Sequence, residues 1–217
     1  MAAVLLSMLW LVCWSLSGQT NERRTAQVTL ELTKGEEWTA IDAGTVLNAG
    51  DKVRFRFRAS FDGVLYVLNQ TSSGGFLWIF PTVETGTENL IVAGREYTVP
   101  ATDGAFRIPA AAGYDTLYWI VTPVGLPALP GLSTFPARNT RKPLRPRCDP
   151  GPLRARGVCL DRTAGPGSAK DPDGVLEALV SRELVSRDVE VTSRNLSKEI
   201  SSRAAGPFVY EFRIAHR

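Results

Sequence analysis

The sequence predicts a mainly β fold, an antiparallel β-sandwich of immunoglobulin-like or related type. Apolar and polar residues alternate with a period of two in short segments between residues 26 and 122, as in strands with one buried face. Turn residues separate these segments and no helical pattern lies between them, which favours antiparallel over parallel sheets. A composition of 44% hydrophobic and 22% charged residues argues against disordered, collagen-like and coiled-coil chains.

Seven strands are expected between residues 26 and 122. The clearest alternation covers residues 53–59, where apolar side chains interleave with arginines, so one face is buried and the other faces water. The reversal at Asp62-Gly63 is expected to join this strand to residues 64–68 in a hairpin, because Asp-Gly readily adopts positive φ. The expected strands cover residues 28–32, 53–59, 64–68, 76–80, 95–99, 105–108 and 116–122.

Three segments carry more specific predictions about their place in the fold. Residues 76–80 are apolar without interruption, which predicts a central strand covered on both faces. Residues 208–214 return to clean alternation and predict a closing strand, whose apolar face needs the same core. Asp171-Pro172-Asp173 predicts the start of a short helix, with an apolar stripe formed by Val175, Leu176, Leu179 and Val180.

The segment 125–170 differs in composition from the rest of the chain. It holds eight of the fourteen prolines, and its nine Lys or Arg residues against two acids give it a charge of +7 in a chain of net charge +3. A loop of this length without periodicity is usually functional or disordered. We therefore expect one β-sandwich domain over residues 26–217, with residues 125–170 as a basic, Pro- and Gly-rich insertion.

The first residues have the pattern of an export signal. Residues 2–14 form an apolar run of suitable length, and the small residues Ser15 and Ser17 stand where a cleavage site requires them. We expect residues 1–17 to be a signal peptide and the mature chain to be periplasmic or extracellular. The run is shorter than the roughly 18–20 residues of a spanning helix and no second one follows, so no transmembrane segment is expected in the mature chain.

Cys148 and Cys159 are expected to form a disulfide. They are the two cysteines that follow the predicted signal peptide, and an even pair in an exported protein is typically oxidised. A redox or metal-binding pair is the less favoured alternative, because neither a Cys-x-x-Cys spacing nor a nearby histidine accompanies them. The bridge would tether the middle of the insertion.

The residue types for most catalytic chemistry are scarce, and we expect no catalytic, cofactor-binding or metal-binding residues. The one histidine is His216, so a Ser or Cys nucleophile has no other candidate base. An acidic pair among Glu36, Glu37 and Asp42 beside Trp38 leaves a glycan hydrolase open, because that chemistry needs two carboxylates and benefits from a stacking aromatic ring. Trp38 is itself a candidate for stacking on a sugar or a peptide side chain, or for packing over one end of the sandwich.

Two sets of cations are candidate binding residues. Arg54, Arg56 and Arg58 lie on the wet face of one strand, where they either grip a polyanion or pair with carboxylates of a neighbouring strand. The second set is a dense cationic stretch of the insertion, suited to loose electrostatic contact with anionic lipid, nucleic acid or envelope polymers. It consists of Arg138, Arg141, Lys142, Arg145, Arg147, Arg154 and Arg156. Because no aromatic residue beyond Phe135 interleaves it, specific nucleic-acid recognition is not expected.

One group of motifs carries a family resemblance. The motifs are Asp62-Gly63-Val64-Leu65-Tyr66-Val67-Leu68-Asn69, Phe80-Pro81, Asn89, Ala93-Gly94, Tyr97, Pro100 and Phe106. Together they resemble the bacterial domain-of-unknown-function family 4384, although Val64 stands where the family usually has tyrosine. Members occur beside kinase or caspase-like peptidase domains or alone in exported proteins, so the resemblance implies a binding or sensing module without chemistry of its own. It assigns no catalytic residue.

These observations together predict an exported, non-catalytic binding or structural module of the bacterial cell envelope, which contacts an unidentified protein or polymer. Two alternatives stay open: an envelope glycan hydrolase with an acidic pair near Trp38, and an electrostatic polyanion binder that uses the Arg-rich insertion.

Overall fold

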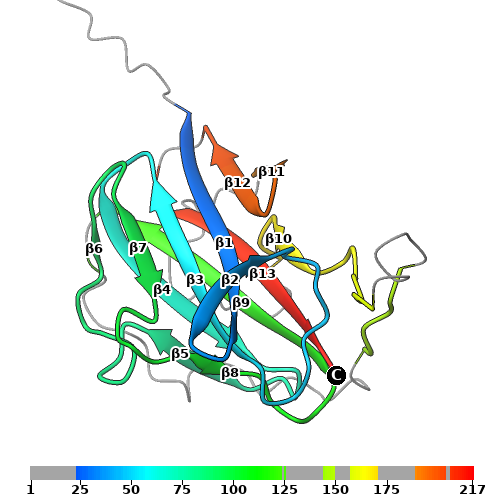
Figure 1. Ribbon diagram of the computed structural model, residues 1–217. Helices are drawn as coiled ribbons and strands as arrows, with labels where there is room; N and C mark the ends of the chain where they lie inside the picture. Colours follow the sequence, from blue (N-terminus) through cyan, green and yellow to red (C-terminus); the bar gives the residue numbers. More distant parts are fainter. Residues whose placement is uncertain (1–22, 124, 126–143, 150–156, 171–188, 204–205) are drawn as a thin grey trace, which may run out of the picture.

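The protein is described by a computed structural model that covers residues 23–123, 125, 144–149, 157–170, 189–203 and 206–217. Its thirteen described strands form two antiparallel sheets that lie one over the other, and the described residues contain no helix (Figure 1). The predicted mainly β class is therefore confirmed. The helix expected from residue 171 and the predicted signal peptide lie outside the described residues.

The first sheet has the strand order β11-β12-β1-β3-β7, with β2 beside β1 and β8 beside β3. Its strands are β1 (Arg24–Lys34), β2 (Glu37–Ile41), β3 (Lys52–Ala59), β7 (Glu96–Val99), β8 (Phe106–Arg107), β11 (Glu190–Arg194) and β12 (Ser197–Ser202). The second sheet has the order β10-β13-β9-β4-β5, with β6 beside β4. Its strands are β4 (Gly63–Gln70), β5 (Phe76–Phe80), β6 (Leu90–Ile91), β9 (Gly113–Thr122), β10 (Gly165–Gly167) and β13 (Phe208–His216).

Aromatic side chains from both sheets meet in the core between them. Phe55 of β3 contacts Trp119 of β9 and Phe212 of β13, with ring centroids 5.3 and 5.2 Å apart. Phe57 of β3 stacks on Trp119, with ring centroids 5.4 Å apart. All four side chains are buried, and edge and stacked ring pairs at these distances stabilise beyond the area that they bury. The alternation predicted for residues 53–59 is therefore observed, with the apolar side chains inward.

The segment predicted to close the fold lies inside the second sheet, between β10 and β9. β13 pairs with β9 from Phe208↔Val121 to His216↔Gly113, and Phe208, Tyr210 and Phe212 are fully buried. Chain segments separated by the whole insertion thus share one hydrophobic core. This is the strand that the alternation of residues 208–214 predicts.

The expected hairpin between residues 53–59 and 64–68 is wrong. β3 belongs to the first sheet and β4 to the second, so the chain crosses between the layers at Asp62-Gly63. Phe61 is partly buried and contacts Phe208 at 5.2 Å between ring centroids, which draws the connection over the core. A Cβ at Gly63 would lie 2.6 Å from the Val121 side chain, so the close approach of the chains requires glycine. The Asp-Gly signal marks a turn but does not say which sheet the next strand joins.

The expected central position of residues 76–80 is also wrong. β5 is the edge strand of the second sheet, and Leu77 is 50% exposed. The strands that are largely buried on both faces are β4, β9 and β13, which lie between the edge strands β5 and β10. The apolar run of residues 76–80 therefore correctly indicates a strand. Its position at the edge of the sheet depends on which strands it pairs with, and the run does not show this.

The described end of the insertion is attached to the sheets. Residues 157–170 include β10, which pairs with β13 through Gly165↔Arg213 and Gly167↔Glu211. Gly165 has a φ of +92° and lies against Ala43, so only glycine fits without strain. No helix within the described residues is long and apolar enough to cross a membrane.

We predict that Phe212→Ala lowers the free energy of unfolding by about 3–5 kcal/mol, because it leaves a cavity between the sheets beside Phe55. Urea denaturation followed by tryptophan fluorescence measures the change. Phe212→Leu should cost less, and the surface change Arg58→Ser should stay within about 0.5 kcal/mol of the original protein. Equal stabilities of the Ala and Ser variants would contradict a core shared by β3 and β13.

Candidate functional site

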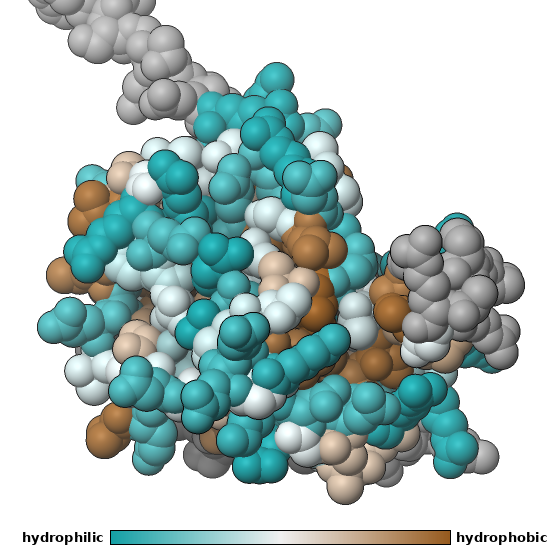
Figure 2. Space-filling view, viewed as in Figure 1, coloured by the Kyte–Doolittle hydropathy of each residue, from teal (hydrophilic) through white to brown (hydrophobic). Residues whose placement is uncertain are grey.

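The two sheets differ in what covers their outer faces. On the second sheet this face is apolar and buried, through Val64, Tyr66, Leu68, Tyr118, Ile120 and Val209. The first sheet presents mainly polar and charged side chains outward, and Lys52 and Arg58 among them are exposed. Figure 2 shows hydrophilic residues over most of this side of the molecule, interrupted by smaller hydrophobic areas. The outer face of the first sheet is therefore the one that a partner can reach.

The arginines of β3 lie on this face and two of them share a carboxylate. Glu31 of β1 is opposite Arg54 in the register, and its Oε2 accepts a hydrogen bond from Arg54 Nε at 2.7 Å. Arg56 Nε lies 2.7 Å from Glu31 Oε1 as an ion pair that lacks hydrogen-bond alignment, and Arg56 also pairs with Glu96 at 3.7 Å. Of the two roles expected for Arg54, Arg56 and Arg58, pairing with carboxylates of a neighbouring strand is therefore observed for Arg54 and Arg56.

Trp38 stands next to this ion-pair network. It is on β2, opposite Thr33 of β1, and the Arg54 guanidinium lies over its ring at 4.3 Å from the centroid. A cation over an indole face stabilises by roughly 0.5–2 kcal/mol, depending on exposure. Arg54, fixed by its hydrogen bond to Glu31, therefore holds the indole of Trp38 in place. Part of the Trp38 surface stays exposed.

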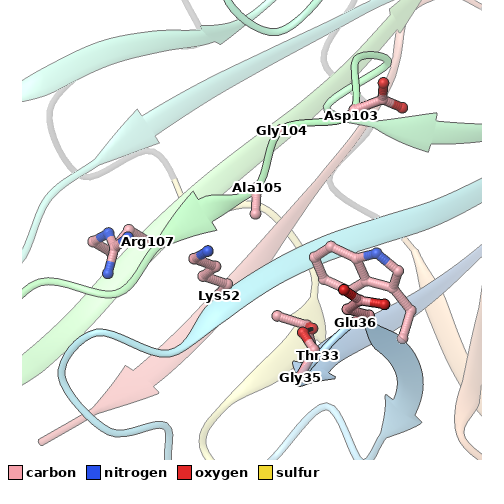
Figure 3. A pocket seen from close by; sticks show the side chains of 9 residues that line it. Thr33, Gly35, Glu36, Lys52, Asp103, Gly104, Ala105 and Arg107 are labelled. Carbon is pink, nitrogen blue, oxygen red and sulfur yellow. Dashed lines mark hydrogen bonds between the residues drawn. The ribbon is translucent and has the colours of Figure 1, made fainter.

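A cavity of about 270 Å³ opens beside Trp38. It lies where the β1–β2 turn, the start of β3 and the connection from β7 to β8 come together (Figure 3). Its walls are Thr33, Gly35, Glu36, Trp38, Lys52, Asp103, Gly104, Ala105 and Arg107. The cavity thus combines an aromatic ring with two cations and two carboxylates, a mixture suited to a small polar ligand.

The two cations of the cavity are direct cross-strand neighbours. Lys52 of β3 and Arg107 of β8 are partners in the antiparallel register, so their side chains leave the same face of the sheet. Both are exposed, and neither forms an ion pair with a carboxylate of the described residues. Sequence reasoning missed both. Lys52 could have been found from the sequence, because it continues the alternation of Arg54, Arg56 and Arg58 on one face of β3. Arg107 has no such signal, and only its pairing with Lys52 in the register places it at the cavity.

The structure does not bring the acidic residues near Trp38 together. Glu36 lines the cavity, whereas Glu37 is an exposed residue at the start of β2. Asp42 lies beyond the other end of that strand, where it accepts a hydrogen bond from the Gly44 backbone and lies 3.8 Å from Lys198 Nζ. The second carboxylate of the cavity is Asp103, which reaches it from the connection between β7 and β8.

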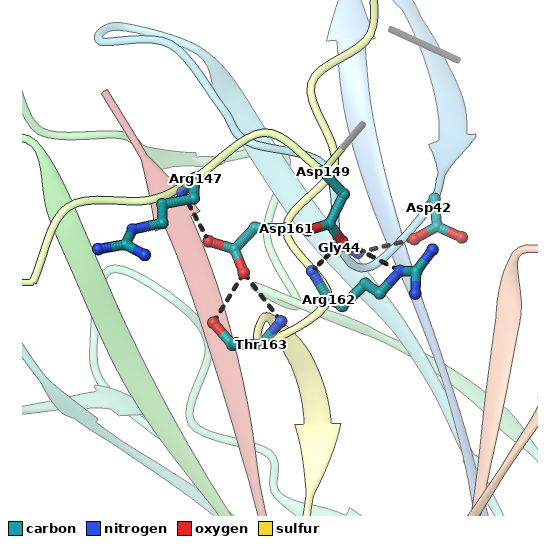
Figure 4. Close-up of polar contacts among 7 residues, drawn as sticks. All are labelled: Asp42, Gly44, Arg147, Asp149, Asp161, Arg162 and Thr163. Carbon is teal, nitrogen blue, oxygen red and sulfur yellow. Dashed lines mark hydrogen bonds and ion pairs between the residues drawn. The ribbon is translucent and has the colours of Figure 1, made fainter. Parts of the chain in front are cut away.

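The described part of the insertion is held by a carboxylate at its centre. Asp161 accepts hydrogen bonds from the Arg147 backbone at 3.0 Å, the Thr163 backbone at 2.8 Å and the Thr163 hydroxyl at 2.7 Å (Figure 4). The Tyr114 hydroxyl of β9 donates a further hydrogen bond to it. Cys148 and Cys159 form the predicted disulfide next to this centre. Asp161 thus attaches the insertion to β9 through Tyr114, and the bridge closes a loop within the insertion.

These contacts alter the ionisation of the two partners. Burial opposes the charged form of Asp161, but hydrogen bonds from Tyr114, Thr163 and two backbone N–H groups outweigh it, so the pKa of Asp161 is lowered. The pKa of Tyr114 is raised by burial and by its hydrogen bond to the carboxylate. Asp161 is therefore ionised at neutral pH, as a structural anion.

The basic stretch of the insertion is described only in part. Arg145 and Arg147 are exposed, and the backbone rather than the guanidinium of Arg147 contacts Asp161. Arg138, Arg141, Lys142, Arg154 and Arg156 lie outside the described residues.

His216 is fully buried and lies outside the cavity lining. Its Nε2 is 3.5 Å from Asp115 Oδ1, and that oxygen also accepts a hydrogen bond from the Ser72 backbone. Throughout the described part of the chain, no group of three His, Cys, Asp or Glu side chains is arranged to hold a metal ion.

Comparison with known proteins gives one match. A family described as "Domain of unknown function (DUF4384)" matches residues 46–124, which confirms the predicted resemblance. The matched segment runs from the residues before β3 to the end of β9. It includes Lys52, Arg54, Asp103 and Arg107 of the site, whereas Trp38 precedes it. No curated protein and no solved structure matches the chain.

We predict that Glu31→Gln lowers the free energy of unfolding by about 1–2 kcal/mol, because it leaves the guanidinium groups of Arg54 and Arg56 without their shared anion. Thermal and urea denaturation measure the change. The matched variant Glu36→Gln removes an exposed carboxylate and should shift stability by no more than about 0.5 kcal/mol. A loss of equal size in both variants would contradict a structural role for the ion-pair network.

We predict that Asp161→Asn destabilises the protein by about 1–3 kcal/mol at neutral pH, because Asn cannot satisfy all four donors around the carboxylate. The pKa of Asp161 is lower in the folded chain than in the unfolded one, so its contribution is complete above the unfolded pKa of about 3.9. The contribution is lost as pH falls through the folded pKa. Urea unfolding at neutral pH and at a series of values below about 4 should show the two proteins converge with falling pH.

Tyr114→Phe provides the control for this pH dependence. It removes one hydrogen bond that lowers the pKa of Asp161, so the pH-dependent loss of stability should be smaller and should be complete at a higher pH than in the original protein. If the stabilities of the original protein and Asp161→Asn converged toward neutral pH instead of acidic pH, this would contradict the conclusion that Asp161 acts as an anion.

Proposed function

We propose that this chain, whose residues 46–124 match the DUF4384 family, is an exported, non-catalytic binding module of the bacterial cell envelope. In this proposal the two sheets form a β-sandwich of immunoglobulin-like or related type, and the outer face of the first sheet contacts a protein or polymer partner. The signal-peptide pattern and the disulfide support export, because disulfides persist in oxidising compartments.

One observation carries the proposal: Trp38, Lys52 and Arg107 surround an open cavity on the accessible face. Trp38 is held from one side by Arg54, so its position is set before any ligand arrives. An oriented aromatic ring loses little conformational entropy on binding, which makes such residues effective contact points. By contrast, the outer face of the second sheet is already buried.

The envelope contact is tested by capture from bacterial envelope extracts with the immobilised protein and two sets of variants. We predict that Trp38→Ala loses the captured partner, whereas Trp38→Phe, which keeps a ring, retains part of it. The double variant Arg145→Gln with Arg147→Gln should retain it fully, because these exposed residues belong to the insertion.

Each result has a defined meaning once denaturation confirms that the variants fold. Capture that survives Trp38→Ala and disappears with the Arg variant would overturn the proposal in favour of polyanion binding through the insertion. Capture unaffected by either change would exclude both surfaces. Replacement of single side chains is preferable to deletion, since residues 157–170 contribute β10 and the Asp161 contacts.

A further inference from the structure

The charges around the cavity are unusual for a sheet surface. Cross-strand neighbours of opposite charge are the common stabilising arrangement, and like charges directly opposite each other cost stability. Lys52 and Arg107 are such a like-charged pair, and both line the same cavity (Figure 3). Two positions further along β3, Arg54 has its carboxylate on the adjacent strand.

The two carboxylates of the cavity do not compensate this pair. Neither Glu36 nor Asp103 forms an ion pair with Lys52 or Arg107, and within the described residues no hydrogen bond engages either carboxylate. The lining therefore offers two cations, which can together bind one anionic group of a ligand. It also offers two carboxylates, which can accept hydrogen bonds from that ligand. A ligand that matches it carries a single negative charge at one end and hydroxyl donors elsewhere.

We propose, as a refinement of the binding function above, that this cavity binds a hexuronic-acid unit of an acidic saccharide. The sugar carboxylate lies between Lys52 and Arg107, and ring hydroxyls donate to Glu36 and Asp103. Trp38 provides the aromatic wall against which the C–H face of the sugar ring packs. Every chemically distinct part of the lining then has a counterpart on one ring.

The lining also argues against the other anionic ligands. A polyanion such as a phosphate polymer brings charge to Glu36 and Asp103 as well as to the cations, so the carboxylates repel it. An acidic peptide satisfies Lys52 and Arg107, but its further acidic side chains are repelled by Glu36 and Asp103. The volume of about 270 Å³ suits a single ring rather than an extended ligand.

Binding of digalacturonate to the purified, disulfide-bonded protein tests this inference, with titration calorimetry and ligand-observed NMR as the measurements. The disaccharide is too short to span from Lys52 to Arg58, which lie roughly 20 Å apart along an extended strand. We expect digalacturonate to bind, its methyl ester to bind at least about tenfold more weakly, and Lys52→Gln and Arg107→Gln each to weaken binding about tenfold. Arg58→Gln, on the same face outside the cavity, should leave binding unchanged.

A second measurement guards against variants that merely unfold. Because Lys52 and Arg107 repel each other, Lys52→Gln should leave the melting temperature unchanged or raise it while binding falls. A melting temperature that falls together with binding would show that the pair is structural, and this would overturn the inference.

Further arms separate the alternatives. Equal binding of an oligoglutamate would overturn the saccharide assignment in favour of an acidic protein, and equal binding of the methyl ester would remove the role of the cations. Cleavage of the disaccharide during the titration would overturn the non-catalytic assignment in favour of a glycan hydrolase. No binding of any probe would overturn this inference, while capture that still depends on Trp38 would leave the binding function itself intact.

Discussion

The contact between Phe55, Trp119 and Phe212 is the constraint on which the rest of the structure depends. These rings come from β3, β9 and β13 and join the two sheets at their centre. Because Phe55 faces inward, the alternation of β3 turns Lys52, Arg54 and Arg56 outward. The charged outer face is thus a consequence of how the core is packed, and a shift of one residue in the register would exchange the two faces.

Much of the fold follows from local patterns, and the errors share one cause. The alternation of residues 53–59 and 208–214 predicts the strands and their inward faces, since period two is a property of a single strand. The order of strands in a sheet, by contrast, depends on interactions between two strands. The sequence pattern therefore failed for the connection at Gly63 and for the edge position of β5, both of which depend on partners distant in the chain.

The candidate site was predictable to a smaller extent. Trp38 and Arg54 could be chosen from their residue types alone, and the disulfide could be predicted from the even number of cysteines after the expected signal peptide. Arg107 and Asp103 lie in a short strand and a polar connection, and the pairing with β3 is what gives them a place in the cavity. Their contribution could be seen only once that register was known.

The position of β13 between β9 and β10 has a consequence for how the protein folds. Its neighbours β9 and β10 precede it, and until residues 208–216 have been synthesised the second sheet lacks the strand that joins them. Until then the core also lacks Phe208, Tyr210 and Phe212, and the long-range pairing with β9 must form late.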